Sequence, residues 1–170
     1  MIYTAVGGLA STFSFVLFVL LAAWYVVPWL RTRSRADALT PLLWVHAFRY
    51  VAFQIFSAQH FGFAVSDPTR NQIVVGDVAG ALLAVAAIIG LRYRSPIAIG
   101  LAWLLAVETM LDLANAVAAG IGERLLETAS AVTWLILAFY VPLLWVTAGL
   151  MLWQLYSRRG EPLTLAARGC

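Results

Sequence analysis

Four ionisable residues, Arg49, Asp77, Glu108 and Asp112, lie well inside long apolar stretches of this sequence. A charged side chain at the centre of a bilayer costs several kcal/mol by most scales, so such residues face the protein interior and often mark function. Arg49 and Glu108 each fall near the middle of an apolar stretch, and the arginine side chain is long. We therefore predict an ion pair between Arg49 and Glu108 within the membrane.

The stretch around Arg49 carries further polar residues. At the α-helical period of about 100° per residue, they share one arc of about 140°. The members of this arc are His46, Arg49, Tyr50, Gln54, Ser57 and His60. The sequence therefore predicts a helix with one polar face inside the membrane.

The stretch around Glu108 has a similar polar face. Glu108, Asp112 and Asn115 are spaced i, i+4, i+7 and fall within about 60° of one another on a helix. Taking depth into account, we predict a polar cavity in the outer half of the bundle. Arg49 and Glu108 would form its floor, and its lining would be His60, Asp77, Asp112 and Asn115.

The last apolar stretch contributes a weaker polar stripe. Thr133, Tyr140, Thr147 and Gln154 recur every seven residues, and we expect this stripe to face inward with Tyr140 near the ligand. Pro142 removes one helical hydrogen bond, which frees the carbonyl of Ala138 and predicts a kink.

Several kinds of chemistry remain open for these residues. A carboxylate such as Glu108, Asp112 or Asp77 could bind a proton or ligand with Arg49 as counter-charge. A carboxylate with His46 could instead act as an acid–base pair on a lipid or isoprenoid, as an isomerase or hydrolase would. The same residues could also only hold helices together.

No cofactor and no metal are expected. Only two histidines exist, His46 and His60, and they are 14 residues apart, about 21 Å along one helix, too far to clamp one haem. The single cysteine, Cys170, is the last residue, which excludes an intrachain disulfide or a cysteine-rich metal site. All basic residues are arginine; without lysine there is no retinal or pyridoxal Schiff base and no P-loop.

The elements that position these residues follow from composition. Of 170 residues, 63% are hydrophobic and 11% are charged, against about 45–50% and 25% in soluble domains. The mean hydropathy of +0.89 is that of a helical membrane protein. We predict an all-α integral membrane protein whose single transmembrane domain, residues 1–157, is a bundle of five helices. The expected spans are about 9–30, 41–63, 73–91, 96–119 and 129–156, followed by a cytoplasmic tail, 158–170.

The orientation follows from the arginines. Eight fall on one side of the predicted membrane and two, Arg70 and Arg124, on the other. The positive-inside rule then places the N-terminus outside and the C-terminus in the cytoplasm. The first span has no basic residues before it, so we expect it to be retained rather than cleaved as a signal peptide. A multi-pass protein of the bacterial inner membrane is expected.

The expected partners are the lipid bilayer and a small or amphipathic ligand, with no nucleic acid, because the net charge of +3 arises from loops. Gly76 and Gly80 form a GxxxG pattern, which indicates close helix packing and a candidate face for a homo-oligomer. The predicted function is binding of that ligand in a polar pocket between the second to fifth helices, with its transport as an extension. The alternatives are an intramembrane enzyme and a structural subunit of a membrane complex.

Overall fold

The computed structural model describes residues 2–161, with side chains from Val6 to Glu161. These residues form helices joined by short loops, with no strand among them, so the predicted all-α class is confirmed. The last helix ends at Ser157. Residues 162–170, which include Arg168 and Cys170, lie outside the described part of the chain.

Four helical segments are long and apolar enough to cross a membrane. They run over Val6–Arg31, Asp67–Arg92, Ile97–Gly122 and Ala131–Ser157. The first comprises α1 (Ile2–Leu21), a π-helical turn η1 (Ala22–Val26) and α2 (Val27–Arg31). The next two are α5 and α6. The last comprises α8 (Ala131–Leu135), a second π-helical turn η3 (Ile136–Tyr140) and α9 (Val141–Ser157). These segments correspond to four of the five spans expected from the sequence.

Helix α5 starts six residues earlier than the predicted span. The pair Asp67–Pro68 lies in the first turn of this helix. The side chain of Ser66 caps the helix by accepting a hydrogen bond from the backbone N–H of Thr69. Proline suits a first helical turn because its missing N–H would have no partner there.

The remaining long segment, Arg35–His60, is helical but not regular. It consists of α3 (Arg35–Ala47), a 3₁₀ stretch η2 (Phe48–Phe53) and α4 (Gln54–His60). The sequence predicts one continuous helix over 41–63, and the structure replaces its centre by the tighter 3₁₀ turn. This segment is the one expected span that is not among the four long apolar helices.

A π-helical turn precedes each of the two prolines that lie beyond the first turn of a long apolar helix, Pro28 and Pro142. Pro28 follows η1 and Pro142 follows η3. In each turn a backbone N–H donates to the carbonyl five residues earlier, from Val27 to Ala22 and from Val141 to Ile136. A proline ring collides with the carbonyl four residues earlier, and a wider turn relieves this. At Pro142, where the sequence predicts a kink, the structure has a π-helical turn.

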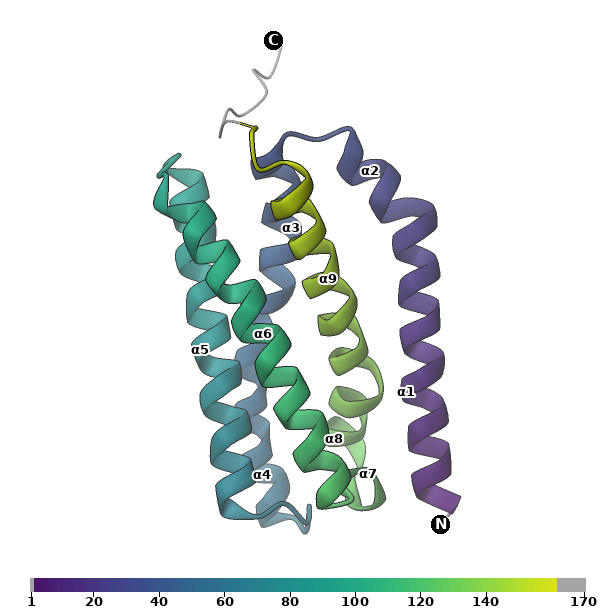
Figure 1. Cartoon of the computed structure of the whole chain (residues 1–170). Helices are drawn as coiled ribbons and strands as arrows, with labels where there is room; N and C mark the ends of the chain where they lie inside the picture. Colours follow the sequence, from purple (N-terminus) through teal and green to yellow (C-terminus); the bar gives the residue numbers. More distant parts are fainter. Residues whose placement is uncertain (1, 162–170) are drawn as a thin grey trace.

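The segments pack as a bundle with α1 at one side (Figure 1). Helices α5 and α6 lie side by side, joined by a tight turn, and α3 packs between α5 and α9. The core at one end is aliphatic, around Leu39, Leu43 and Leu105. Helix α1 packs on α7 (Leu125–Thr128), η3 and α9.

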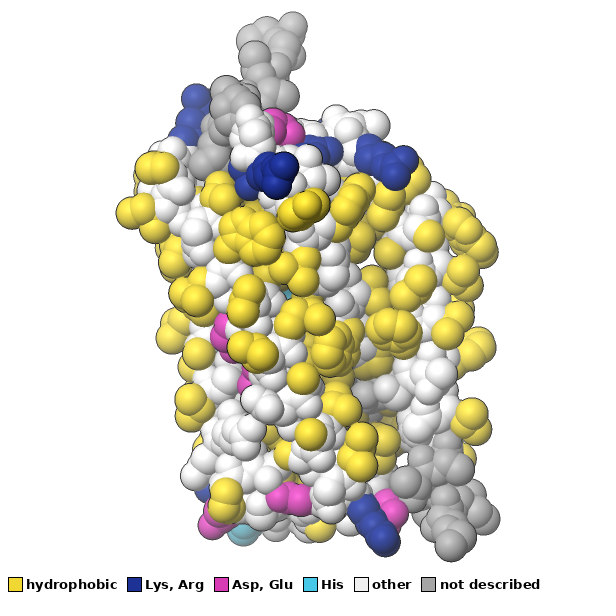
Figure 2. Space-filling view, in the orientation of Figure 1, with side chains coloured by type: hydrophobic (Ala, Val, Ile, Leu, Met, Phe, Trp, Pro, Cys, Tyr) yellow, Lys and Arg dark blue, Asp and Glu magenta, His cyan; other side chains and the backbone are white. Residues whose placement is uncertain are grey.

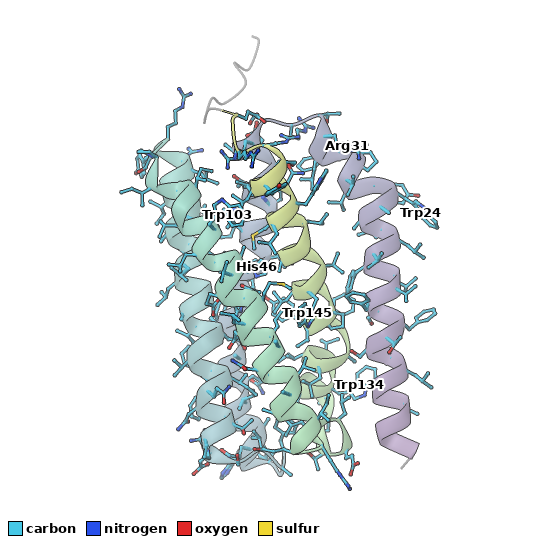
Figure 3. All side chains as sticks on the ribbon, in the orientation of Figure 1. Trp24, Arg31, His46, Trp103, Trp134 and Trp145 are labelled. Atoms are coloured by element: carbon cyan, nitrogen blue, oxygen red, sulfur yellow. The ribbon has the colours of Figure 1, made fainter. Side chains whose placement is uncertain are left out.

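Hydrophobic side chains cover the middle of the visible surface and basic ones lie at its ends (Figure 2). Trp24 lies on the outer side of α1, whereas His46 lies in the middle of the bundle (Figure 3).

Side-chain contacts close both ends of the bundle. At one end, the carboxylate of Glu123 accepts hydrogen bonds from Ser66 and Thr69, and these bonds hold the pKa of the Glu123 carboxyl below its usual value. At the opposite end, the Arg158 guanidinium donates to the carbonyls of Leu30 and Arg33. These contacts hold the loops at the two ends of the bundle in place.

Candidate functional site

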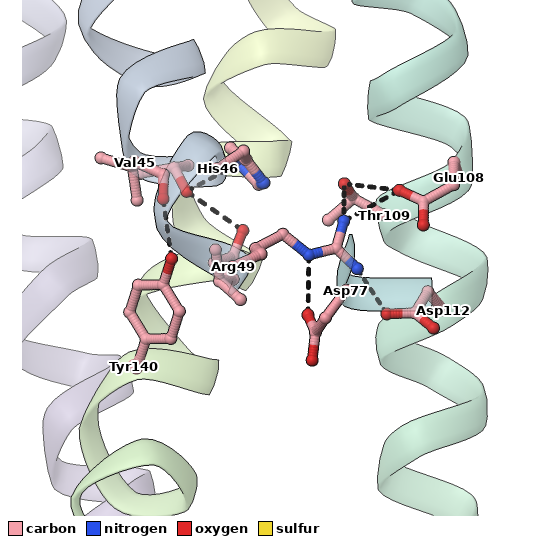
Figure 4. A network of polar contacts seen from close by, with 10 residues as sticks. Val45, His46, Arg49, Asp77, Glu108, Thr109, Asp112 and Tyr140 are labelled. Carbon is pink, nitrogen blue, oxygen red and sulfur yellow. Dashed lines mark hydrogen bonds and ion pairs between the residues drawn. The ribbon is translucent and has the colours of Figure 1, made fainter. Parts of the chain in front are cut away.

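Arg49 is the centre of a polar network in the middle of the bundle (Figure 4). Its side chain is fully buried, with 0% exposure. Nε donates to Asp77 Oδ1 at 2.8 Å, and Nη2 donates to Asp112 Oδ2 at 2.5 Å. Nη1 donates both to Glu108 Oε2 at 2.8 Å and to Thr109 Oγ1 at 2.9 Å. The predicted Arg49–Glu108 ion pair is confirmed, and the same guanidinium also binds two further carboxylates.

Two glycines of α5 make the space for this network. A Cβ atom on Gly80 would lie 2.0 Å from Arg49 Nη1, and one on Gly76 would lie 1.8 Å from Asp112 Oδ1. The GxxxG pattern therefore accommodates charged side chains of the same chain. The homo-oligomer contact expected on the Gly76/Gly80 face stays a prediction.

The polar face predicted around Arg49 is divided by the 3₁₀ stretch. His46 and Arg49 are buried, whereas Gln54, Ser57 and His60 are exposed. A 3₁₀ helix turns about 120° per residue instead of about 100°, so six residues rotate the rest of the helix by roughly a further 120°. The uniform α-helical period assumed from the sequence is wrong here, and the residues after η2 turn away from the network.

Tyr50 lies on the same outer side, 53% exposed. Together with Gln54 it lines an open groove between η2 and η3, whose other walls are mainly apolar. His60 packs edge-on against Phe61 at 5.3 Å between ring centroids. None of these residues contacts the carboxylates.

Helix α6 supplies two carboxylates and a hydroxyl. Its buried face includes Thr109, which is fully buried and bonded to Arg49. Asp112 lies about 60° from Thr109 around the helix. Glu108 lies about 100° from Thr109, and its side chain still contacts Arg49. Asn115 lies about 120° away and is exposed, so the structure does not bring it to the network. Thr109 could have been singled out from the sequence as a polar residue next to Glu108. A threonine in an apolar helix also commonly has no role in a site, so this signal is weak.

Two side chains of the last segment support α3 from the other side. Tyr140 Oη donates to the carbonyl of Val45 at 2.7 Å, one turn before Arg49. Thr147 Oγ1 lies 3.1 Å from His46 Nε2. The inward stripe predicted for this segment is confirmed, since Thr133, Thr147 and Gln154 are buried. These contacts hold the backbone of α3 where its pitch changes.

A cavity of about 450 Å³ extends from the network toward the end of the bundle that carries α4 and α7. Arg49, Asp77, Asp112 and Tyr140 form its polar part, and Arg124 lies in the loop at its other end. Most of the remaining lining is apolar and comes from α4, α5, α6, α7, η3 and α9. Of the four side chains predicted to line the cavity, Asp77 and Asp112 do so, whereas His60 and Asn115 do not. Of the two predicted floor residues, Arg49 lines the cavity and Glu108 does not.

Helix α1 also lines the cavity, although the pocket was expected between the second to fifth spans only. Gly8, Ser11 and Thr12 face it across from α6. His46 does not line it, so the acid–base pair of His46 with a carboxylate is not assembled around this space. Within the described residues, no group of three or more histidine, cysteine or acidic side chains is arranged to hold a metal ion.

Fold and site together define an all-helical bundle with an intramembrane-type charge network beside a largely apolar cavity. The chain belongs to the DUF8737 family, described as a domain of unknown function, whose model matches residues 6–156. No curated protein and no solved structure matches the chain.

The fit of Arg49 against α5 gives a direct prediction. Gly80→Ala should lower the free energy of unfolding by about 1–3 kcal/mol, because the added methyl group collides with the guanidinium in a closed network. Gly100→Ala is the matched control, since a Cβ there meets nothing within 4 Å. Thermal unfolding in detergent measures both variants. Equal melting temperatures for the two would contradict the packing described.

Proposed function

We propose that the protein is a multi-pass protein of the cell membrane, the inner membrane of a bacterium, with five crossings. The crossing that adds to the four long apolar helices would be Arg35–His60, the second in chain order. With 20 α-helical and six 3₁₀ residues, this segment is roughly 40 Å long, more than the ~30 Å of hydrocarbon. Its polar centre is satisfied within the bundle, as an intramembrane charge requires.

The arginines support an orientation with the N-terminus outside. One end of the bundle holds the α2–α3 loop, the α5–α6 turn and the end of α9, which together carry Arg31, Arg33, Arg35, Arg92 and Arg94. The opposite end carries Arg70 and Arg124. By the positive-inside rule the richer end faces the cytoplasm.

The orientation can be tested by cysteine labelling. In a Cys170→Ser background, we expect a cysteine at Glu127 to react with a membrane-impermeant maleimide added to intact cells, and one at Tyr93 to react only after permeabilisation. Both positions are exposed, and they lie at opposite ends of the bundle. Labelling of the Tyr93 position in intact cells would contradict this topology.

Within this membrane domain, we propose that the cavity binds a small amphipathic ligand. The observation that carries the proposal is the combination of a charged cluster at one end with a mainly apolar lining along the rest, apart from Arg124 at the far end. Ligand sites are commonly clefts of about 300–1,000 Å³, largely apolar with a few polar groups that fix orientation. A cavity of about 450 Å³ falls in that range. Transport would be an extension of the same binding.

Filling the cavity tests the proposal. Ala116 lines it, whereas Ala118, two residues along the same helix, is exposed. We expect Ala116→Phe to abolish binding of the neutral apolar dye N-phenyl-1-naphthylamine, and Ala118→Phe to preserve it. The measurement is a fluorescence titration in nonionic detergent, with protein-free micelles subtracted.

If both variants bind the dye as the wild type does, the dye binds outside this cavity. An absence of saturable binding to the wild-type protein would remove the proposed function altogether.

A further inference from the structure

We propose that the ligand of this cavity is a lipophilic organic cation, such as a protonated or quaternary amine, whose head lies against Asp77 and Asp112. This inference rests on the proposed function, because it assigns a chemical class to the ligand of the same cavity. It follows from which hydrogen-bonding groups remain free at the polar end.

The guanidinium of Arg49 is already occupied. Four of its five N–H groups donate to Asp77, Asp112, and the Glu108–Thr109 pair, which leaves one Nη2–H. An anionic head group would need two such donors for a bidentate contact. It would also have to approach between carboxylates that already bind the arginine. An arginine beside a cavity commonly indicates an anion site, but this one does not have the donors to spare.

The free groups at this end are acceptors. Asp77 and Asp112 each use one oxygen to bind Arg49, so Asp77 Oδ2 and Asp112 Oδ1 accept no hydrogen bond among the described residues. Asp112 Oδ1 packs against Gly76 of α5, and Asp77 Oδ2 is the other acceptor. The Tyr140 hydroxyl donates its one hydrogen bond to the Val45 carbonyl, so its oxygen can only accept further hydrogen bonds. A head group that donates hydrogen bonds, or carries a positive charge, complements this set.

The charges point to the same class. The ionised forms of Asp77, Glu108 and Asp112 carry three negative charges around a single guanidinium, an excess of two. Other charged groups near the network do not offset this excess. Arg124 lies at the far end of the cavity, and His46 does not line the cavity and is hydrogen-bonded to Thr147. In an apolar bundle such an excess attracts a cation strongly, because Coulomb interactions are poorly screened there.

Arg124 could hold an anion at the far end of the cavity. The tail of an anion bound there would then lie against Asp77 and Asp112, which would leave the acidic end in contact with hydrocarbon. A cation bound the other way round places its charged head at the acids and its apolar body along Ile55, Leu113 and Leu137. In the second arrangement the acids face a charged partner, and Arg124, whose side chain is exposed, is left to the solvent.

Two ions of the same shape and opposite charge provide the test. Tetraphenylphosphonium and tetraphenylborate are titrated calorimetrically into the full-length protein in nonionic detergent, with protein-free micelles subtracted. We expect the phosphonium to bind at least roughly tenfold more tightly, the effect of about 1.4 kcal/mol. Asp77→Asn and Asp112→Asn should each weaken phosphonium binding by roughly the same factor, and Glu127→Gln, which is exposed and outside the cavity, should leave it unchanged.

Binding of N-phenyl-1-naphthylamine reports on the cavity itself in every variant. If the dye binds but the borate binds as tightly as the phosphonium, or neither aspartate variant weakens phosphonium binding, the charge preference is wrong while the cavity function stands. A borate preference lost in Arg124→Gln would assign the site to anions. If the dye does not bind the wild-type protein, the proposed function fails and this inference fails with it. A variant that unfolds is replaced by the other aspartate variant, since each removes one of the two free carboxylates.

Discussion

The burial of one guanidinium among three carboxylates is the constraint on which this structure depends. A buried arginine is tolerated only if its N–H groups are satisfied, and here three segments must converge to do so. Segment Arg35–His60 brings Arg49, α5 brings Asp77, and α6 brings Glu108, Thr109 and Asp112. The register of these three segments is thereby fixed at mid-depth, where apolar packing alone would allow sliding.

The irregular features of the helices serve this convergence. Gly76 and Gly80 leave α5 without side chains where the guanidinium and Asp112 need room. The π turn before Pro142 precedes Val141 and includes Tyr140, whose hydroxyl supports the carbonyl of Val45. The same hydroxyl lies at the polar end of the cavity. Tyr140 therefore both supports the backbone and shapes the cavity.

Much of this arrangement could be predicted from the sequence, because hydropathy and charge act over whole segments. The helical class, four of the long spans and the Arg49–Glu108 contact all follow from apolar length and from the cost of a buried charge. The placement of Gln54, Ser57 and His60 could not be predicted. It depends on a 3₁₀ stretch at Phe48–Phe53 that no proline or glycine marks. The role of the GxxxG pattern was missed for a related reason, since the pattern indicates space but not what fills it.

The stability of charge-balanced variants tests the central role of Arg49 most directly. Arg49→Leu leaves three carboxylates without a counter-charge and should cost roughly 3–5 kcal/mol of unfolding free energy. Adding Asp77→Asn, Glu108→Gln and Asp112→Asn removes the unpaired charge, so this fourfold variant should recover most of that loss. The measurement is reversible unfolding by dodecyl sulfate titration in mixed micelles. An Arg49→Leu protein as stable as the wild type, or a fourfold variant less stable than Arg49→Leu, would contradict the account.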